Sequence, residues 1–176
     1  MEVINVKRKG TWREVADAAR TTIGMEPGKG EPSDAWKTRI LLAEHSPIRK
    51  LSITATFIDL PYWVSVHLTR HKIGVEHWVK SQRGEGRGAL NQGELVTHEI
   101  EANYQAIINI SRKRLCTKAA TETQNAWVEL LTMIDDIEPL LLDVCVPECI
   151  YRGFCPEFKS CGWLIDEFLE DYRSVK

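Results

Sequence analysis

The sequence has 176 residues, of which 43% are hydrophobic, with 23 basic and 25 acidic side chains and a formal net charge of −2. This is enough apolar sequence for one packed core, so we expect a single domain over residues 1–176. The balanced charge argues against binding to nucleic acid or to a membrane surface by bulk electrostatics. The longest apolar stretches are too short to span a bilayer, and no apolar signal segment is visible, so the expected compartment is the cytoplasm.

The apolar periodicity predicts an α+β fold in which helices predominate. Thr11, with Glu14 three residues on, and Ser33 are the expected helix caps. A glycine-rich stretch, Gly84–Gln92, is expected to be a mobile loop. In chain order, we expect a strand at Val3–Val6, helices at Thr11–Ile23 and from Ser33 to Glu44, a strand at Leu51–Ile58, a helix at Tyr62–His71, long helices at about His98–Lys118 and Thr121–Leu142, and a final helix at Trp163–Tyr172.

Four of the five cysteines crowd into an irregular segment near the C-terminus, with the spacing C-x3-C-x5-C-x5-C. In a reducing compartment such clusters are more often metal ligands or reactive thiols than disulfides. Four thiolates can close a tetrahedral zinc site, although zinc modules usually use C-x2-C or C-x4-C pairs. The candidate zinc ligands are Cys145, Cys149, Cys155 and Cys161. In the other interpretation these are free thiols, and Cys116 is a buried apolar residue of a helix.

The stretch from His67 to Arg83 concentrates three of the five histidines and four cationic side chains. Arginine and lysine at this density, followed by a serine and a glycine-rich loop, suit an anionic ligand such as a phosphate. His67 and His71 are four residues apart, but no glutamate stands between them as a zinc protease motif requires. The alternative is a solvated basic surface beside Trp78.

Several motifs of the chain resemble those of the flavin-dependent thymidylate synthases. Arg70-His71-Lys72, followed by Ser81-x-Arg83, is similar to the family signature R-H-R-x5-E-x-S-x-R-Y. Upstream, residues 18–24 resemble A-A-R-V-S-Y-G, and residues 44–47 resemble G-H-x-[ST]-P. Downstream, residues 114–124 match the spacing of R-L-x3-A-Q-x-E-I-R. The resemblance covers roughly residues 15–125, in the same order throughout.

The resemblance implies an α+β fold with an antiparallel sheet and long helices, assembled as a homotetramer with sites shared between subunits. It implies methylation of dUMP at C5 without a cysteine nucleophile, using methylenetetrahydrofolate, FAD and NADPH. The short length and altered signature suggest a phage type, in the cytoplasm of a bacterium or of a phage-infected host. The implied partner is a pyrimidine deoxynucleotide, with no nucleic acid and no membrane.

The resemblance also assigns roles by position. An arginine beside the uracil ring can stabilise negative charge that develops on the base. The third signature residue is Lys72 in place of arginine. A guanidinium that can form two parallel hydrogen bonds is thus replaced by an ammonium group that acts as a point charge. The implied catalytic residues are Arg70 and Ser81; the cofactor-binding residues are Ser46, Arg70, His71, Lys72, Asn103 and Asn109; the substrate-binding residues are His67, Arg70, Ser81, Arg83, Gln105 and Gln124.

Three alternatives stay open beside thymidylate synthesis. The first is a divergent relative that modifies another pyrimidine nucleotide at C5. The second is a non-catalytic oligomer that binds nucleotide or flavin. The third, a zinc-bearing domain that binds nucleic acid, is disfavoured by the net charge of −2.

Overall fold

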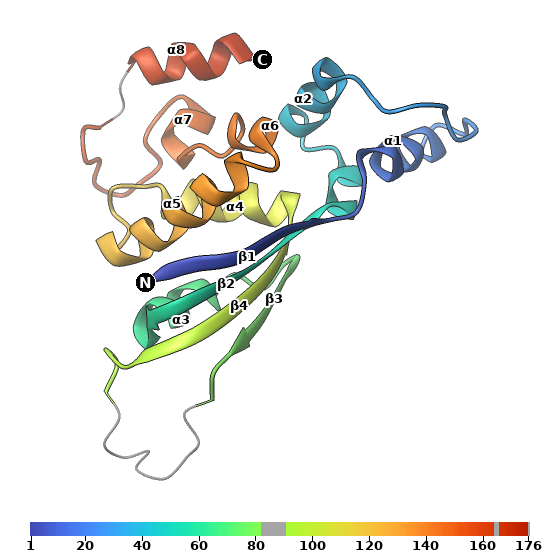
Figure 1. The fold of residues 1–176 in the computed structure, drawn as a ribbon. Helices are drawn as coiled ribbons and strands as arrows, with labels where there is room; N and C mark the ends of the chain where they lie inside the picture. The colour runs from blue at the N-terminus through green and yellow to red at the C-terminus, as the bar shows by residue number, and fades with distance from the viewer. Residues whose placement is uncertain (82–90, 164–165, 176) are drawn as a thin grey trace.

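The structure, a computed structural model, describes residues 1–81, 91–163 and 166–175, and Figure 1 shows their arrangement. Within these residues, no helix is long and apolar enough to cross a membrane. The elements are β1 (Glu2–Lys9), α1 (Trp12–Thr21), α2 (Asp34–Leu42), the 3-10 helix η1 (Ser46–Lys50), β2 (Ser52–Pro61), α3 (Tyr62–Leu68), β3 (Val75–Val79), β4 (Leu95–Asn103), α4 (Tyr104–Arg114), α5 (Thr121–Asp135), α6 (Pro139–Leu142), α7 (Glu148–Arg152) and α8 (Asp166–Val175).

Four antiparallel strands form one sheet in the order β1-β2-β4-β3. Alternate residues of β2 and β4 are buried, as expected when one face of a sheet packs on helices and the other faces solvent. Helices α4 and α5 lie together along one side of the sheet (Figure 1), and α3 contacts β2 and β4. The predicted α+β fold with an antiparallel sheet is therefore confirmed.

The expected helix from His98 to Lys118 is wrong in its first part. Residues 95–103 are strand β4, and the helix begins only at Tyr104. The buried residues of β4 alternate strictly, but one of them is His98, whose ring is fully buried. A polar residue on the inward face obscured the two-residue period in the sequence. Strand β3, at Val75–Val79, was not predicted either.

The expected helix from Thr121 to Leu142 is two helices. Helix α5 ends at Asp135, and α6 begins with Pro139, because proline suits the first turn of a helix and not its interior. The cysteine-rich segment, expected to be irregular, contains the short helix α7. The expected loop at Gly84–Gln92 falls largely on residues 82–90, outside the described residues.

A buried carboxylate joins three segments that are far apart in the sequence. Glu138 is 4% exposed and accepts hydrogen bonds from Trp12 Nε1 (3.0 Å), Tyr104 Oη (2.8 Å) and Arg8 Nη1 (2.8 Å). These donors come from the start of α1, the start of α4 and the end of β1. The predicted caps at Thr11, which forms a capping box with Glu14, and at Ser33 are confirmed.

Candidate functional site

The signature segment borders a cavity of about 350 Å³ together with one face of α4. Arg70, His71 and Lys72 contribute from the turn that follows α3, and Asn109 contributes from α4. The structure thus brings together four of the predicted site residues. The remaining lining residues are apolar, Ile73, Ala106 and Ile110, and no carboxylate lines the cavity among the described residues. An apolar cavity with two cations and one amide suits a ligand that carries both a ring and an anionic group.

His71 is neutral and fixed in orientation by a neighbouring arginine. Arg114 Nε donates to His71 Nε2 at 3.0 Å, and its Nη2 donates to the carbonyl oxygen of His67 at 2.5 Å. Because this bond uses the lone pair of Nε2, the ring proton belongs on Nδ1. Burial, and then the positive charge of Arg114, lower the pKa of His71 to about 4. The charge of the cavity therefore comes from Arg70 and Lys72.

His67 faces the start of α5. Its Nδ1 lies 3.0 Å from the hydroxyl of Thr123, which is fully buried. Burial, followed by the charges of Arg114 and Arg70, lowers the pKa of His67. Gln124, beside Thr123, donates to the carbonyl oxygen of Leu115 at 3.2 Å. His67 and Gln124 thus lie at one junction of α3 with α5, outside the lining of the cavity itself.

Behind the signature turn lies a pair of histidines that the sequence did not single out as a unit. His77 Nε2 lies 2.8 Å from the carbonyl oxygen of His71, and His77 Nδ1 lies 2.9 Å from His98 Nε2. A carbonyl only accepts, so in the neutral pair His77 carries its proton on Nε2 and accepts from His98. In the part of the chain that the structure describes, the buried His98 Nδ1 then has no hydrogen-bond partner. Burial, and then His77, lower the pKa of His98 to about 4.

A polar cluster on α4 adjoins the cavity through Asn109. Asn109 Oδ1 accepts from Arg112 Nη1 at 3.2 Å and from Gln105 Nε2 at 3.5 Å. Both Gln105 and Arg112 also donate to the carboxylate of Glu44. The backbone of Glu44 has a positive φ of 47°. The guanidinium of Arg112 lies over the Tyr151 ring, 3.5 Å from its centroid. Gln105, a predicted substrate residue, is therefore engaged with Glu44.

Asn103, a predicted cofactor residue, caps α4. Its Oδ1 accepts from the backbone N–H of Ala106 at 2.9 Å, and its own N–H donates to the carbonyl of Gly74 at 2.9 Å. Gly74 has φ +73°, and a Cβ there would lie 2.4 Å from Asn103 Nδ2. This contact fixes the signature turn against α4, so Asn103 acts on the geometry of the cavity.

Three predicted residues lie elsewhere. Ser46 is exposed at the start of η1, two residues after Glu44. Ser81 is exposed two residues beyond the end of β3, and Arg83 lies outside the described residues. Val75 pairs with Ala102, at the end of β4 that lies near the cavity. At the rise per residue of a β-strand, the chain from Val75 to Ser81 spans roughly 20 Å. Within one chain, Ser81 is therefore not part of the cavity.

The cysteines divide differently from the expected set. Cys145 lies in the main core, where burial raises the pKa of its thiol to about 12. Cys149, Cys155 and Cys161 border a small separate cavity, and the fourth cysteine there is Cys116. Cys116 is only partly buried, so Cys145, not Cys116, is the buried apolar cysteine.

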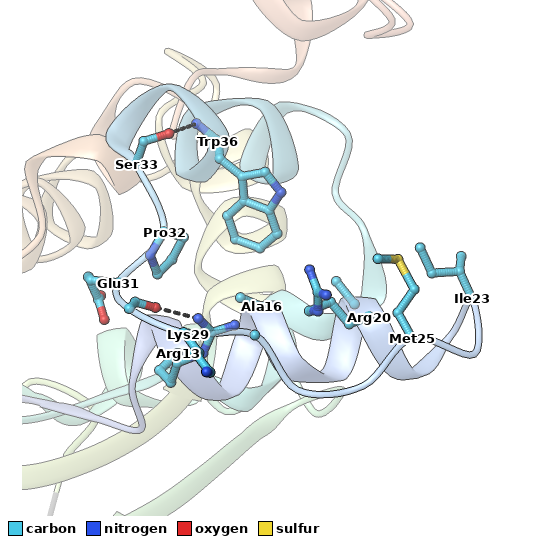
Figure 2. A pocket seen from close by; sticks show the side chains of 13 residues that line it. Arg13, Ala16, Arg20, Ile23, Met25, Lys29, Glu31, Pro32, Ser33 and Trp36 are labelled. Atoms are coloured by element: carbon cyan, nitrogen blue, oxygen red, sulfur yellow. Dashed lines mark hydrogen bonds between the residues drawn. The ribbon is translucent and has the colours of Figure 1, made fainter.

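A larger cavity, of about 520 Å³, lies between α1, α2 and the segment that joins them. Figure 2 shows Arg20 and Trp36 bordering it, with Ile23 and Met25 at one end. Ala19, Arg20 and Ile23 belong to the first motif of the resemblance, but none of the predicted site residues lines this cavity. Arg20 Nε donates to the carbonyl oxygen of Glu26 at 2.6 Å, so part of its donor capacity is used within the chain.

Comparisons with known proteins agree with the resemblance. No protein-family profile matches the chain. Over 61 residues the chain is 36% identical to a flavin-dependent thymidylate synthase of Clostridium tetani (strain Massachusetts / E88). This match covers 34% of the chain and 24% of that relative, so it spans about a quarter of the relative's length.

Two solved structures share the fold. The flavin-dependent thymidylate synthase of Helicobacter pylori, complexed with FAD and dUMP, has a TM-score of 0.66 at 15% identity, covering 83% of this chain and all of that one. The UMP/dUMP methylase PolB of Streptomyces cacaoi, bound with 5-Br dUMP, has a TM-score of 0.65 at 13% identity, covering 87% and 94%. The chain thus has the fold of the flavin-dependent thymidylate synthases, and the resemblance predicted from its motifs is confirmed.

Proposed function

We propose that the chain is a flavin-dependent thymidylate synthase that methylates dUMP at C5, with methylenetetrahydrofolate as carbon donor and NADPH as reductant of FAD. The observation that carries the proposal is the convergence of Arg70, His71, Lys72 and Asn109 on one cavity of about 350 Å³. Its volume lies within the range of small-molecule sites. The fold shared with a synthase solved with FAD and dUMP supports the same conclusion.

The residues present fit a flavin and a nucleotide. FAD, when bound, supplies the hydride that completes the methyl group. The Arg70 guanidinium donates to anionic oxygens and stabilises negative charge that develops on the uracil ring. The Lys72 ammonium neutralises a phosphate, and the Asn109 amide orients a polar ring edge. His71, neutral and bonded to Arg114, holds the signature turn and adds no competing charge.

We propose in addition that the active form is a homotetramer in which neighbouring chains share each site. Ser81 is a predicted catalytic residue, yet it lies about 20 Å along the chain from the residues at the cavity. A second copy that supplies Ser81 and Arg83 to this cavity would bring the two halves of the signature together. Sedimentation velocity of the purified protein tests this assembly, with a monomer at assay concentration as the contrary result.

The decisive experiment uses the full chain. We expect the purified protein to be yellow or to take up added FAD, and to convert dUMP to dTMP with methylenetetrahydrofolate and NADPH, read by mass spectrometry. A protein that binds neither FAD nor dUMP contradicts the proposal. Binding of both without turnover identifies the non-catalytic oligomer instead. The expected compartment, the cytoplasm of a bacterium or of a phage-infected host, stays a prediction that cell fractionation tests.

A second candidate is C5 modification of another pyrimidine nucleotide. Lys72 replaces the third arginine of the signature, and Gln105 is bonded to Glu44, so two expected nucleotide contacts differ. The shared fold with a UMP/dUMP methylase favours this candidate as well. A panel of UMP, dUMP, CMP and dCMP in the same mass assay separates the two functions by which nucleotide is consumed.

A further inference from the structure

Four cysteines border one small cavity that the proposed function does not use. Cys116 follows the end of α4, Cys149 belongs to α7, and Cys155 and Cys161 lie in the segment after α7. Cys116 is separated from the other three in sequence by α5 and α6, so only the fold brings the four together. The sequence spacing alone selected Cys145 in place of Cys116.

The size of this cavity selects the kind of ligand. Its volume is about 20 Å³. One water-sized sphere requires about 10–15 Å³. The cavity therefore accommodates a single atom or ion and is too small for a nucleotide.

The chemistry of the lining suits a soft divalent cation. The four cysteines that line the cavity come from three separate places in the chain: after α4, in α7 and after α7. The backbone N–H of Trp163 donates to Cys161 Sγ at 3.4 Å, and both residues line the cavity. Thiolates in this number are the donors that zinc prefers.

Two carboxylates line the cavity, and one of them already has partners. Glu148 lines the cavity, but its Oε1 accepts from Arg152 Nε at 2.6 Å, and its Oε2 lies 3.2 Å from Lys113 Nζ. These two cations occupy both carboxylate oxygens. The donors left for an ion are the sulfur atoms and the exposed carboxylate of Glu157, which also lines the cavity. Of these a soft cation such as zinc favours the sulfurs.

The C-terminal part of the chain also has little core of its own. Its buried cluster consists of Ile150, Leu169 and Tyr172, packed against partly buried neighbours. A cluster of this size stabilises a segment weakly, and natural proteins often add a metal or a disulfide in such places. A cross-link from α4 to the segment after α7 would supply that stability.

We propose that Cys116, Cys149, Cys155 and Cys161 bind one structural zinc ion in a tetrahedral four-sulfur site. As the side chains stand, no group of three or more histidine, cysteine, aspartate or glutamate side chains among the described residues is placed so that it could hold a metal ion. Binding therefore draws the four sulfurs inward to about 2.3 Å from the metal and orders the segment as it does so. Cys145 takes no part, since it is buried in the main core.

Metal analysis of the full chain tests this site independently of flavin or nucleotide binding. We expect about one zinc ion per chain in protein from zinc-supplemented cells, as a closed four-sulfur site requires. Cys149→Ser and Cys161→Ser are expected to lose most of it, whereas the matched control Cys145→Ala keeps it. Zinc content equal to wild type in Cys149→Ser, or loss in Cys145→Ala alone, overturns the assignment.

Cobalt substitution of the wild-type chain tests the metal site without relying on variants, which could fail to fold. Metal-stripped, reduced protein titrated with Co²⁺ is expected to give the intense thiolate-to-cobalt charge-transfer bands of a tetrahedral four-sulfur site. Zinc should then displace the cobalt and abolish the bands. Absence of these bands, stoichiometric iron, or disulfides among these cysteines in freshly purified protein contradicts the proposal.

Discussion

Arg114 Nε donates to His71 Nε2 at 3.0 Å, and this bond joins the end of α4 to the signature turn. The bond requires a neutral imidazole, because a protonated ring has no lone pair to accept with. A single arginine therefore sets both the tautomer and the orientation of the residue at the centre of the signature. The same arginine also holds the end of α3 through the carbonyl of His67.

Replacing Arg70 with alanine is expected to weaken binding of dUMP or FAD without affecting the fold. Arg70 is exposed and lines the cavity, so its loss removes a charge-assisted contact and no buried packing. One such contact contributes about 1.5–3 kcal/mol, or roughly a 10- to 100-fold change in Kd. Isothermal titration calorimetry measures the affinity, and circular dichroism measures the fold.

The control for this change is Lys7→Ala, which removes an exposed cation on β1. We expect its affinity to equal that of wild type. Equal affinity in Arg70→Ala as well would mean that the ligand binds elsewhere, and the cavity between α1 and α2 would be examined next.

Stability should fall as the pH falls from about 6.5 to about 4. His71 and His98 have folded-state pKa values of about 4, against an ordinary value of 6.5. Between these values the unfolded chain binds protons that the folded chain does not, so acid favours unfolding, while above pH 6.5 the two groups have no effect. For the fully buried His98 the slope approaches about 1.4 kcal/mol per pH unit.

Urea unfolding of wild type and of His98→Gln across this pH range measures the effect. Glutamine retains an N–H donor toward His77 but does not titrate. The difference in unfolding free energy between the two proteins should therefore change between pH 6.5 and 4 and stay constant above it. A pH-independent difference would show that His98 is accessible to protons in the folded state.

Gly74→Ala should destabilise the protein more than Gly24→Ala. Both glycines have positive φ, of 73° and 70°, so both substitutions meet the same backbone strain of about 1–2 kcal/mol. A Cβ at Gly74 would also meet Asn103, whereas one at Gly24 meets nothing within 4 Å. Displacing the Asn103 cap adds about 1 kcal/mol.

Thermal or urea unfolding of the two variants gives this comparison directly. We also expect Gly74→Ala to lower FAD or dUMP affinity, because Asn103 and Gly74 fix the signature turn against α4. Equal destabilisation of the two variants would refute the contact with Asn103.

Glu138→Ala is expected to cost about 2–6 kcal/mol of stability. It leaves the buried donors of Trp12 and Tyr104 without their acceptor, and each such donor costs about 1–3 kcal/mol. The control Glu129→Ala, at an exposed position of α5, should change stability by less than about 0.5 kcal/mol. Urea unfolding measures both, and similar small values would mean that the Glu138 pocket admits water.

The sequence predicted those features of the fold and of the site that depend on residues close together in the chain. The capped helix at Thr11, strand β2 and the grouping of Arg70, His71 and Lys72 were all predictable, because each depends on neighbouring residues. Strand β4 was mistaken for a helix because His98 occupies an inward position that only the His77 ring makes acceptable.

The remaining differences depend on contacts between distant segments. Nothing near Asn103 indicates that it caps a helix against Gly74, and nothing near Cys116 indicates that it joins Cys149 across α5 and α6. Glu138 is similar, since two of its three donors lie near the N-terminus and the third, Tyr104, lies in the middle of the chain. Spacing in the sequence cannot reveal partners that only tertiary packing provides.

Strand β3 separates Ser81 from the cavity that holds Arg70, and this arrangement has a genetic consequence. If each site takes Arg70 from one chain and Ser81 from another, Arg70→Ala and Ser81→Ala damage different halves of it. The two impaired variants, mixed and reassembled, should then regain dTMP synthesis, since some sites take both intact residues from different parent chains. Mixtures that stay inactive would place both residues in one chain's site. Two defective copies of this gene in one cell could in that way support growth that neither supports alone.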